Sequence, residues 1–168
     1  MRINRRSHTG LNKKIKSLTA LKSEILTLKK SGKRIVFTNG CFDILHYGHA
    51  KYLEDAKAKG DILVVAVNSD SSIRKIKGKN RPIVDEANRI KLLAALESID
   101  LLTLFKETTP LKVIEAVKPD ILIKGADWDK AKIVGSDFVE AYGGRVMTVK
   151  LVKGLSTTNL IKKIAKTG

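Results

Sequence analysis

Two of the chain's three histidines, His46 and His49, stand three residues apart in the segment GCFDILHYGH at residues 40–49. On a helix, this spacing places both rings on one side of the first turn. A helix N-terminus offers unpaired N–H groups and partial positive charge, so it attracts phosphate. Gly40 and Gly48 would let the backbone approach a ligand closely. The segment therefore indicates a site where two imidazoles stabilise phosphate charge during a displacement.

Other interpretations of these residues are less favoured. Two histidines could cap a helix or lie satisfied in the core, but the pairing with glycines favours a ligand site. A zinc site is disfavoured because Cys41 is the only other clustered ligand, and two ligands at this spacing make a poor cage. Cys41 itself has no evident base partner, so it is interpreted as a small turn residue and not as a nucleophile. Neither a Walker A loop nor a GxGxxG fingerprint is present.

The rest of the chain alternates between short β-branched runs and helical patterns. Strands are predicted over residues 34–38, 62–67, 101–105, 121–124 and 146–149. Helices are predicted over residues 18–30, 49–59, 86–96, 110–117, 136–142 and 157–166. Thr109 is expected to cap a helix that opens with Pro110, and Ser156 is expected to cap the last helix.

This alternation predicts an α/β fold: a single Rossmann-like three-layer α/β/α domain with a five-stranded parallel sheet. Ligands in such sheets bind beyond the carboxyl ends of the strands, at the point where the strand order reverses. The first predicted strand runs into Thr38-Asn39-Gly40-Cys41-Phe42-Asp43, and the fourth runs into Lys124-Gly125-Ala126-Asp127-Trp128. These two strand ends are therefore expected to carry the chemistry.

The pattern Gly40-x-Phe42-Asp43-x-x-His46-x-Gly48-His49 resembles the GxFDxxHxGH signature of the cytidylyltransferase-like nucleotidyltransferases. Ser156-Thr157-Thr158 matches the STT triplet that opens a late helix in that family. The similarity runs from about Gly32 to Lys163. It is greater still to the D-glycero-β-D-manno-heptose 1-phosphate adenylyltransferases, including the C-terminal half of the bifunctional heptose kinase/adenylyltransferase, and implies a stand-alone transferase. The segments shared with them are 34–43, 67–70, 77–78, 81–82, 124–127, 135–136, 143–144 and 156–163.

The resemblance implies that a sugar phosphate attacks the α-phosphorus of ATP directly, with His46, His49 and Lys77 as catalytic residues. Lys77 lies in a mobile-looking stretch, residues 77–80, where its charge could bridge the attacking phosphate and the α-phosphate. Mg²⁺ is the expected cofactor, bound through triphosphate oxygens with no protein ligand. The expected nucleotide-binding residues are Thr38, Asn39, Gly40, Cys41, Phe42, Gly48, Gly125, Asp127, Ser156, Thr157 and Thr158.

Three further residues are weaker candidates for contact with the acceptor. Arg89 could reach phosphate or be an exposed helical arginine. Asp43 could contact substrate, although ordering of its loop is favoured, and Trp128 follows Asp127, which is expected to receive ribose or sugar hydroxyls. An Asx turn is the alternative for Asp127.

The nucleotide and acceptor are left open between related activities. Lys51 and Trp128 resemble residues of the glycerol-3-phosphate cytidylyltransferases. Those enzymes usually carry Arg-Thr-x-Gly before the STT triplet, whereas this chain has LVKG at residues 151–154, which favours ATP. A cytidylyltransferase acting on glycerol 3-phosphate or ethanolamine phosphate, or an FAD synthetase, remains the alternative.

The formal net charge is +16, and residues 1–33 hold ten lysines and arginines against Glu24 alone. We predict a flexible basic arm over residues 1–16 and a nucleotidyltransferase domain over residues 17–168. A non-catalytic nucleic-acid-binding protein is the alternative from a different class. It is disfavoured because the arm lacks interleaved aromatic residues and no zinc-finger or RNP-type signature occurs.

The composition favours a cytoplasmic protein that does not insert into membranes. No apolar stretch is long enough to cross a bilayer, and no apolar segment with a cleavage site follows the N-terminus. The single cysteine, Cys41, fits a reducing compartment. A homodimer is what the resemblance implies.

Overall fold

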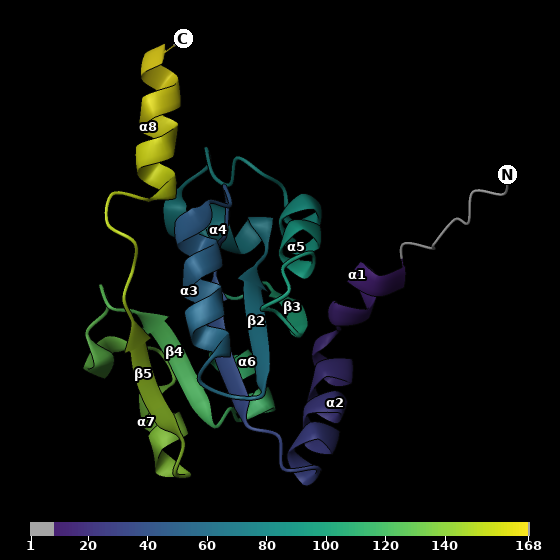
Figure 1. Cartoon of the computed structure of the whole chain (residues 1–168). Helices are drawn as coiled ribbons and strands as arrows, with labels where there is room; N and C mark the ends of the chain where they lie inside the picture. Colours follow the sequence, from purple (N-terminus) through teal and green to yellow (C-terminus); the bar gives the residue numbers. More distant parts are fainter. Residues whose placement is uncertain (1–8, 168) are drawn as a thin grey trace, which may run out of the picture.

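The computed structural model describes residues 9–167 and builds them around a parallel sheet in the order β3-β2-β1-β4-β5 (Figure 1). The strands are β1 (Ile35–Gly40), β2 (Ile62–Asn68), β3 (Leu101–Phe105), β4 (Ile121–Gly125) and β5 (Arg145–Val149). All four pairings between neighbouring strands are parallel. Each of the five predicted strands is confirmed, with boundaries that differ by at most two residues.

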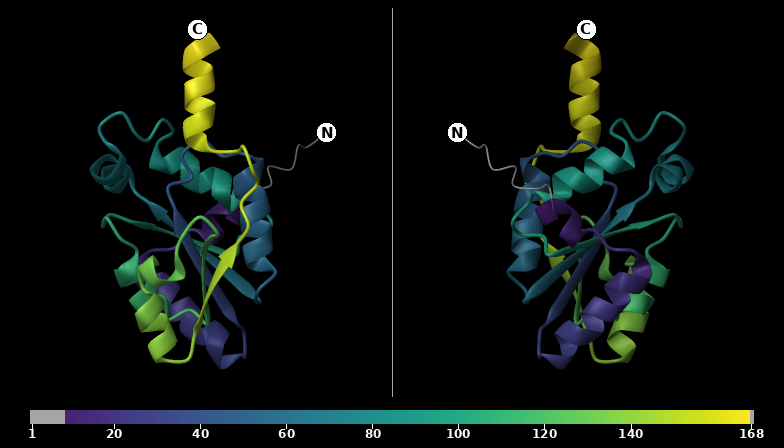
Figure 2. Two further views of the ribbon diagram at one scale, coloured as in Figure 1. Left: turned by 90° about the vertical axis from the view of Figure 1, so that its left-hand side faces the viewer. Right: turned by 90° about the vertical axis from the view of Figure 1, so that its right-hand side faces the viewer.

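Helices cover both faces of this sheet (Figures 1 and 2). They are α1 (Thr9–Lys14), α2 (Leu18–Lys30), α3 (Tyr47–Lys57), α4 (Asp70–Lys77), α5 (Glu86–Ala94), α6 (Leu111–Val117), α7 (Ser136–Ala141), α8 (Thr157–Thr167) and the short 3₁₀ helix η1 (Lys130–Lys132). One buried apolar cluster joins the sheet to α3 and α5, and the other joins it to α2, α6 and α7. The predicted three-layer α/β/α class is confirmed.

The strand order reverses between β1 and β4. From β1 the chain adds β2 and then β3 on one side, and it returns to place β4 on the other side of β1. The register pairs Phe37 of β1 with Leu122 of β4, so both strands point toward the same edge of the sheet. The carboxyl ends of β1 and β4 therefore meet there, as the sequence predicts.

The second half of the predicted basic arm is part of the fold, and the prediction is wrong for residues 9–16. Residues 9–14 form α1, and Ile15 makes a parallel β-bridge to Leu102 of β3. Lys14 Nζ donates to the carbonyl oxygen of Leu96 at 2.9 Å. Ile15 packs against the apolar cluster beneath α3 and α5, which gives this segment a reason to dock. Residues 1–8 of the predicted arm lie outside the described residues.

Helix α4 is absent from the sequence prediction because it presents little apolar pattern. Ile73 is its one fully buried large side chain, and Ser69 caps its start by accepting from the backbone N–H of Ser72 at 3.1 Å. Pro110 also differs from its prediction, since it precedes α6 and does not open it. Its carbonyl oxygen still accepts from the N–H of Ile114 at 3.0 Å.

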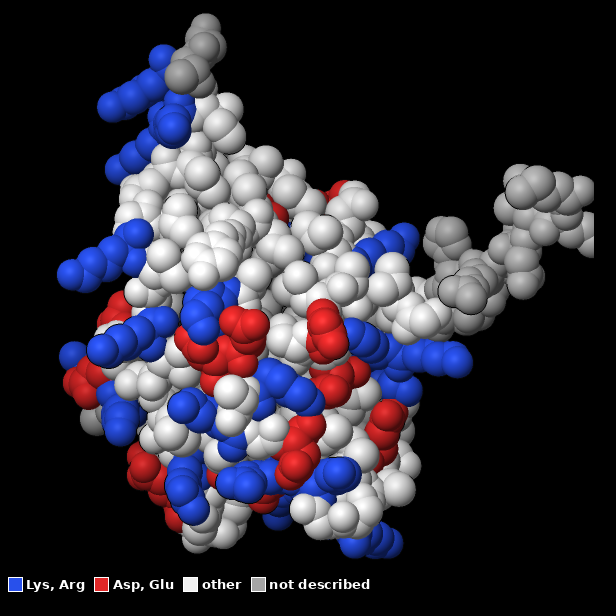
Figure 3. Space-filling view, viewed as in Figure 1, with Lys and Arg blue, Asp and Glu red and all other residues white. Residues whose placement is uncertain are grey.

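The basic character of the chain does not form one continuous stripe on the face drawn in Figure 3. Acidic side chains lie among the lysines and arginines over the sheet-covering helices, whereas the visible charges of α8 are all basic. Within residues 9–167, no helix is both long enough and apolar enough to span a bilayer.

Candidate active site

A cavity of about 340 Å³ lies at the edge where β1 and β4 end. Its walls come from these two strand ends, the turn into α3, the end of α4 with the loop behind it, and the start of α8. The lining residues are Asn39, Gly40, Cys41, Phe42, Asp43, His46, Gly48, His49, Tyr52, Lys77, Arg81, Lys124, Gly125, Asp127, Trp128, Leu151, Val152, Leu155, Ser156, Thr157 and Thr158. The structure thus gathers nearly all of the predicted site residues into one cavity.

The two histidines sit at the start of α3 with their rings stacked. His46 is the N-cap residue, and His49 N donates to its carbonyl oxygen at 2.9 Å. The ring centroids are 3.9 Å apart with an interplanar angle of 23°, and Phe42 packs edge-on against His49 at 5.4 Å. A Cβ on Gly48 would lie 3.0 Å from the His46 ring, so glycine allows this stack.

Burial favours the neutral form of both rings, and three of their ring nitrogens have no hydrogen-bond partner within the protein. Burial lowers the pKa of His49 to about 4, and the neighbouring His46 and Lys77 act in the same direction. Burial also lowers the pKa of His46. Both ring nitrogens of His46 and Nδ1 of His49 are buried without a protein partner. A bound anion would offer the missing acceptors and would favour the protonated rings.

The turn from β1 into α3 depends on a tight contact. Phe42 has a φ of 46°, and a Cβ on Gly40 would lie 2.9 Å from its ring. Asn39 and Cys41 line the cavity from the same turn, and Asn39 Oδ1 is buried without a partner. Burial raises the pKa of the Cys41 thiol, which disfavours the nucleophilic thiolate and agrees with the interpretation of Cys41 as a turn residue.

Asp43 holds this turn to the loop after α4. Its Oδ1 accepts from the backbone N–H groups of Ile83 at 2.8 Å and Val84 at 2.9 Å, and its Oδ2 accepts from Arg81 Nε at 2.6 Å. Both oxygens are therefore engaged. These bonds agree with the favoured prediction that Asp43 orders its loop, and contact of Asp43 with substrate stays a prediction.

Lys77 is the last residue of α4, not a member of a structureless stretch. Gly78 follows it with a φ of 93°, which glycine adopts readily, and turns the chain away. Lys77 lines the cavity, and its charge contributes to the lowered pKa of His49 and partly opposes the rise that burial causes in the pKa of Cys41.

The opposite strand end supplies Lys124, Gly125, Asp127 and Trp128. A Cβ on Gly125 would lie 2.5 Å from Asp127 Oδ1 and 3.1 Å from the Leu151 side chain, so a larger residue would displace these side chains. Lys124 Nζ lies 3.4 Å from the carbonyl oxygen of Asn39 and 5.5 Å from the centroid of the Trp128 ring. Burial lowers the pKa of Lys124 to about 8.

The start of α8 closes the cavity. Ser156 Oγ accepts from the backbone N–H of Asn159 at 3.1 Å, which confirms the predicted cap. Thr157 and Thr158 follow in the first turn and line the cavity. Leu155 reaches the histidines, because a Cβ on Gly48 would lie 3.3 Å from its Cβ. Backbone N–H groups at this helix start can bind phosphate.

Two predicted site residues do not line the cavity. Thr38 is fully buried within β1, and its hydroxyl lies 2.7 Å from the Tyr52 hydroxyl. Arg89 has no exposed side-chain surface. The predictions that Thr38 binds nucleotide and that Arg89 reaches phosphate are therefore wrong, and so is the alternative that Arg89 is an exposed helical arginine.

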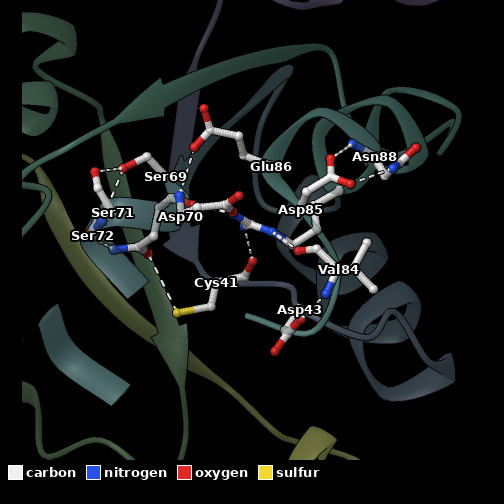
Figure 4. A network of polar contacts seen from close by, with 12 residues as sticks. Cys41, Asp43, Ser69, Asp70, Ser71, Ser72, Val84, Asp85, Glu86 and Asn88 are labelled. Carbon is white, nitrogen blue, oxygen red and sulfur yellow. Dashed lines mark hydrogen bonds and ion pairs between the residues drawn. The ribbon is translucent and has the colours of Figure 1, made fainter. Parts of the chain in front are cut away.

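Arg89 instead belongs to a buried polar network with Cys41, Asp70 and Val84, which Figure 4 labels. Its guanidinium donates to the carbonyl oxygens of Val84 at 2.9 Å, Cys41 at 2.5 Å and Asn68 at 2.9 Å. It also pairs with Asp70 Oδ1 at 2.8 Å. These bonds tie the first strand end, the start of α4 and the loop before α5 together.

Several lining residues were not predicted from the sequence to contribute to the site. They are Tyr52, Arg81, Lys124, Leu151, Val152 and Leu155. Lys124 could have been found, because a lysine directly after a run of buried apolar strand residues must lie at the ligand edge. Tyr52 gave no such signal, since it lies inside a helix, whereas Arg81 belongs to the shared segment 81–82 but was not assigned a role.

No cluster of three or more His, Cys, Asp or Glu side chains able to hold a metal ion occurs among residues 9–167. The cavity is instead lined by the cationic side chains of Lys77, Arg81 and Lys124. This donor set suits an anionic ligand.

Comparison with known proteins gives relatives over nearly the whole chain. The sequence model of the cytidylyltransferase-like family matches residues 37–166. The chain is 53% identical over 159 residues to the bifunctional protein HldE of Geobacter metallireducens, which covers 95% of this chain and 32% of that protein. It is 51% identical over 156 residues to the bifunctional protein HldE of Campylobacter fetus, again with 32% of that protein covered. The chain spans about a third of the length of these curated relatives.

Two solved structures share the fold. One is the lipopolysaccharide core biosynthesis protein of Thermoplasma volcanium, with a TM-score of 0.61 and 39% identity, covering 73% of this chain and 98% of that one. The other is the pantoate-beta-alanine ligase of Francisella tularensis in complex with beta-gamma ATP and beta-alanine. It covers 91% of this chain and 76% of that one at a TM-score of 0.61, and its 17% identity supports the fold alone.

Proposed function

The chain belongs to the cytidylyltransferase-like family and is a nucleotidyltransferase, and we propose that it transfers AMP from ATP to D-glycero-β-D-manno-heptose 1-phosphate. The products are ADP-heptose and pyrophosphate. The heptose acceptor follows from the resemblance to the heptose 1-phosphate adenylyltransferases, and a relative named for lipopolysaccharide core biosynthesis agrees with a sugar acceptor.

One observation carries the proposal. Within the described part of the chain, the buried side-chain polar atoms without a protein partner all belong to four cavity residues: Asn39, His46, His49 and Arg81. Buried polar groups are normally hydrogen-bonded, so such atoms at one place call for a ligand with complementary groups. Donors from two imidazoles and a guanidinium, beside the start of α8, suit a polyphosphate.

The residues have distinct roles in the proposed transfer. An oxygen of the acceptor phosphate attacks the α-phosphorus of ATP, the bond from that phosphorus to the bridging oxygen breaks, and pyrophosphate leaves in line. His46 and His49 stabilise the charge at the α-phosphate, and Lys77 bridges the attacking phosphate and the α-phosphate. Thr157, Thr158 and the N–H groups of α8 hold the β- and γ-phosphates. Catalysis is then positioning and charge stabilisation without a covalent enzyme intermediate.

Nucleotidyltransferases generally use a divalent metal ion, and we propose Mg²⁺ for this one. The cavity fits an ion held by the nucleotide, because its free charged side chains are mainly cations and both oxygens of Asp43 are engaged. Mg²⁺ would neutralise triphosphate oxygens and take few or no protein ligands. Asp127 is the nearest candidate for ribose or sugar hydroxyls.

ATP is favoured over CTP within this proposal. Lys51, one of the two residues that resemble the glycerol-3-phosphate cytidylyltransferases, does not line the cavity and pairs with Asp55 at 2.6 Å. Residues 151–154 also lack the arginine that precedes the STT triplet in those enzymes.

A pyrophosphate-release screen tests the proposal. ATP and CTP are each incubated with D-glycero-β-D-manno-heptose 1-phosphate, glycerol 3-phosphate and FMN in the presence of Mg²⁺. We expect the fastest release with ATP and the heptose phosphate, and ADP-heptose as the product by mass spectrometry. Faster turnover of CTP with glycerol 3-phosphate, or of ATP with FMN, would replace this function with the corresponding alternative.

Two further properties stay proposals. The resemblance implies a homodimer, which sedimentation equilibrium tests by mass. A cytoplasmic location is proposed from the unpaired Cys41 thiol, and fractionation of the source cells tests it.

A further inference from the structure

Arg81 is a cavity-lining cation whose guanidinium is only partly hydrogen-bonded by the protein. Its Nε donates to Asp43 Oδ2 at 2.6 Å, and the two side chains are 15% and 1% exposed. Its Nη2 atom is buried and has no acceptor within the protein. Burial of a guanidinium donor without an acceptor is unfavourable, so this atom indicates a contact that forms only when a ligand binds.

Asp43 holds the guanidinium of Arg81 in place. The carboxylate is held by the N–H groups of Ile83 and Val84 at Oδ1, which leaves Oδ2 to orient the guanidinium. With Nε bound to Asp43, Nη2 is a donor of the planar guanidinium that remains buried without a protein acceptor. A rigid fork of this kind matches two oxygens of one phosphate, whereas a lysine offers a point charge only.

Arg81 and the start of α8 reach the cavity from different walls. The segment that leads into α8 approaches the cavity through Leu155, which lies close to Gly48. Arg81 comes from the loop after α4, which Figure 2 shows as a teal arch separate from the yellow α8. In-line displacement needs the attacking and leaving oxygens on opposite sides of the phosphorus. If pyrophosphate leaves toward α8, the attacking phosphate enters beside Arg81 and Lys77.

We propose that Arg81 binds the phosphate of the acceptor substrate and that Asp43 is the positioning residue for its guanidinium. This inference rests on the proposed function, in which the phosphate of the acceptor attacks the α-phosphorus of ATP. The site would thereby select acceptors that carry a phosphate and reject the same alcohol without it.

Calorimetric titration separates the two substrates. α,β-methylene-ATP, which cannot release pyrophosphate, is titrated first, and D-glycero-β-D-manno-heptose 1-phosphate is then titrated into the saturated complex. We expect Arg81→Gln to weaken acceptor binding about 10- to 100-fold, as for loss of a charged hydrogen bond, while affinity for the ATP analogue changes less than about threefold. Lys79→Gln is the matched control, because Lys79 is an exposed cation of the same loop outside the cavity.

Arg81→Lys is a second variant in case Arg81→Gln fails to fold. Lysine keeps the charge beside Asp43 but lacks the planar fork of the guanidinium. We expect this variant to unfold at nearly the wild-type temperature and to weaken acceptor binding about tenfold. The proposal is overturned if either folded Arg81 variant binds the acceptor like the wild type. It is also overturned if the ATP analogue is weakened equally, or if Lys79→Gln has the same effect.

A double-mutant cycle tests the role of Asp43. Asp43→Asn should weaken acceptor binding in the wild-type background and have little further effect once Arg81 is glutamine. Equal losses in both backgrounds would mean that Asp43 acts on the fold alone. If the wild type binds glycerol 3-phosphate and not the heptose phosphate, the proposed acceptor is wrong. The same variants then test Arg81 with glycerol 3-phosphate.

Discussion

Two groups of polar residues lie next to each other at the carboxyl edge of this sheet, and they differ in how completely they are hydrogen-bonded. The histidine turn, with His46 and His49, leaves three ring nitrogens buried without a protein partner. The network around Arg89 directs its guanidinium to three carbonyl oxygens and one carboxylate (Figure 4). The histidine turn, called here the open group, is suited to bind a ligand. The Arg89 network, called here the closed group, holds the site together.

The closed group offers the test with the largest expected effect. Arg89→Met should lower the free energy of unfolding by about 3–5 kcal/mol, because Asp70 and three carbonyl oxygens lose a buried partner. Urea denaturation followed by circular dichroism measures this loss. Lys91→Met, at an exposed position of the same helix, is the control and should change stability by less than about 0.5 kcal/mol. A loss below about 1 kcal/mol for Arg89→Met would contradict the stabilising role of the Arg89 network.

Substitutions in the open group should impair catalysis and change stability less than substitution of Arg89. His46→Ala and His49→Ala should each lower kcat about 10²- to 10³-fold, as for loss of one preorganised donor. Affinity for α,β-methylene-ATP should change only a few-fold, and the free energy of unfolding should change less than for Arg89→Met, because no protein group loses a side-chain hydrogen-bond partner. Tyr47→Ala is the control, since Tyr47 lies between the histidines, is 65% exposed and does not line the cavity. Near-normal turnover by both histidine variants would contradict the assignment.

The pH dependence of the free energy of unfolding gives a further test of the histidine turn. The unfolded chain protonates His49 near its ordinary pKa of 6.5, whereas the folded chain does so only at about 4. Because the unfolded state then binds more protons, stability should fall as the pH drops from 7 to 5. We expect His49 to contribute about 1–2 kcal/mol of that fall, discounted for its partial exposure.

His49→Gln isolates this contribution, because glutamine does not titrate. Urea titrations at pH 7 and pH 5 should show a smaller loss of stability in the variant than in the wild type. Asp61, Asp85 and Glu107 titrate below this window, since their pKa values lie below 3.8, 3.8 and 4.5. Equal losses in the two proteins would mean that the folded His49 titrates normally.

The start of α8 both stabilises the fold, through its cap, and contributes to the cavity. A substitution there should change stability and catalysis least. Ser156 is engaged as a cap, while Thr157 and Thr158 beside it line the cavity. Ser156→Ala should remove about 1 kcal/mol of cap stability and raise KM for ATP severalfold. Ser156→Asp keeps a cap but adds negative charge, so its KM should rise further. A lower KM for the aspartate variant would argue against phosphate binding at this helix.

Periodicity predicted the five strands and most helices, because strands and amphipathic helices need apolar residues at fixed intervals. It missed α4, whose sequence DSSIRKIK has few apolar residues and is stabilised by the Ser69 cap and the burial of Ile73. It also assigned residues 9–16 to an arm, because the docking of Ile15 beside Leu102 depends on a strand almost ninety positions away.

The amino-acid sequence by itself determined the strand ends that carry the site and the paired histidines, because both follow from local spacing. The tertiary structure alone decided which polar residues are open and which are closed. Arg89 and Arg81 look alike in the sequence, yet one is enclosed by four acceptors and the other keeps a free edge toward the cavity. Hydrogen-bond partners are supplied by segments distant in sequence, and only the folded chain brings those segments together.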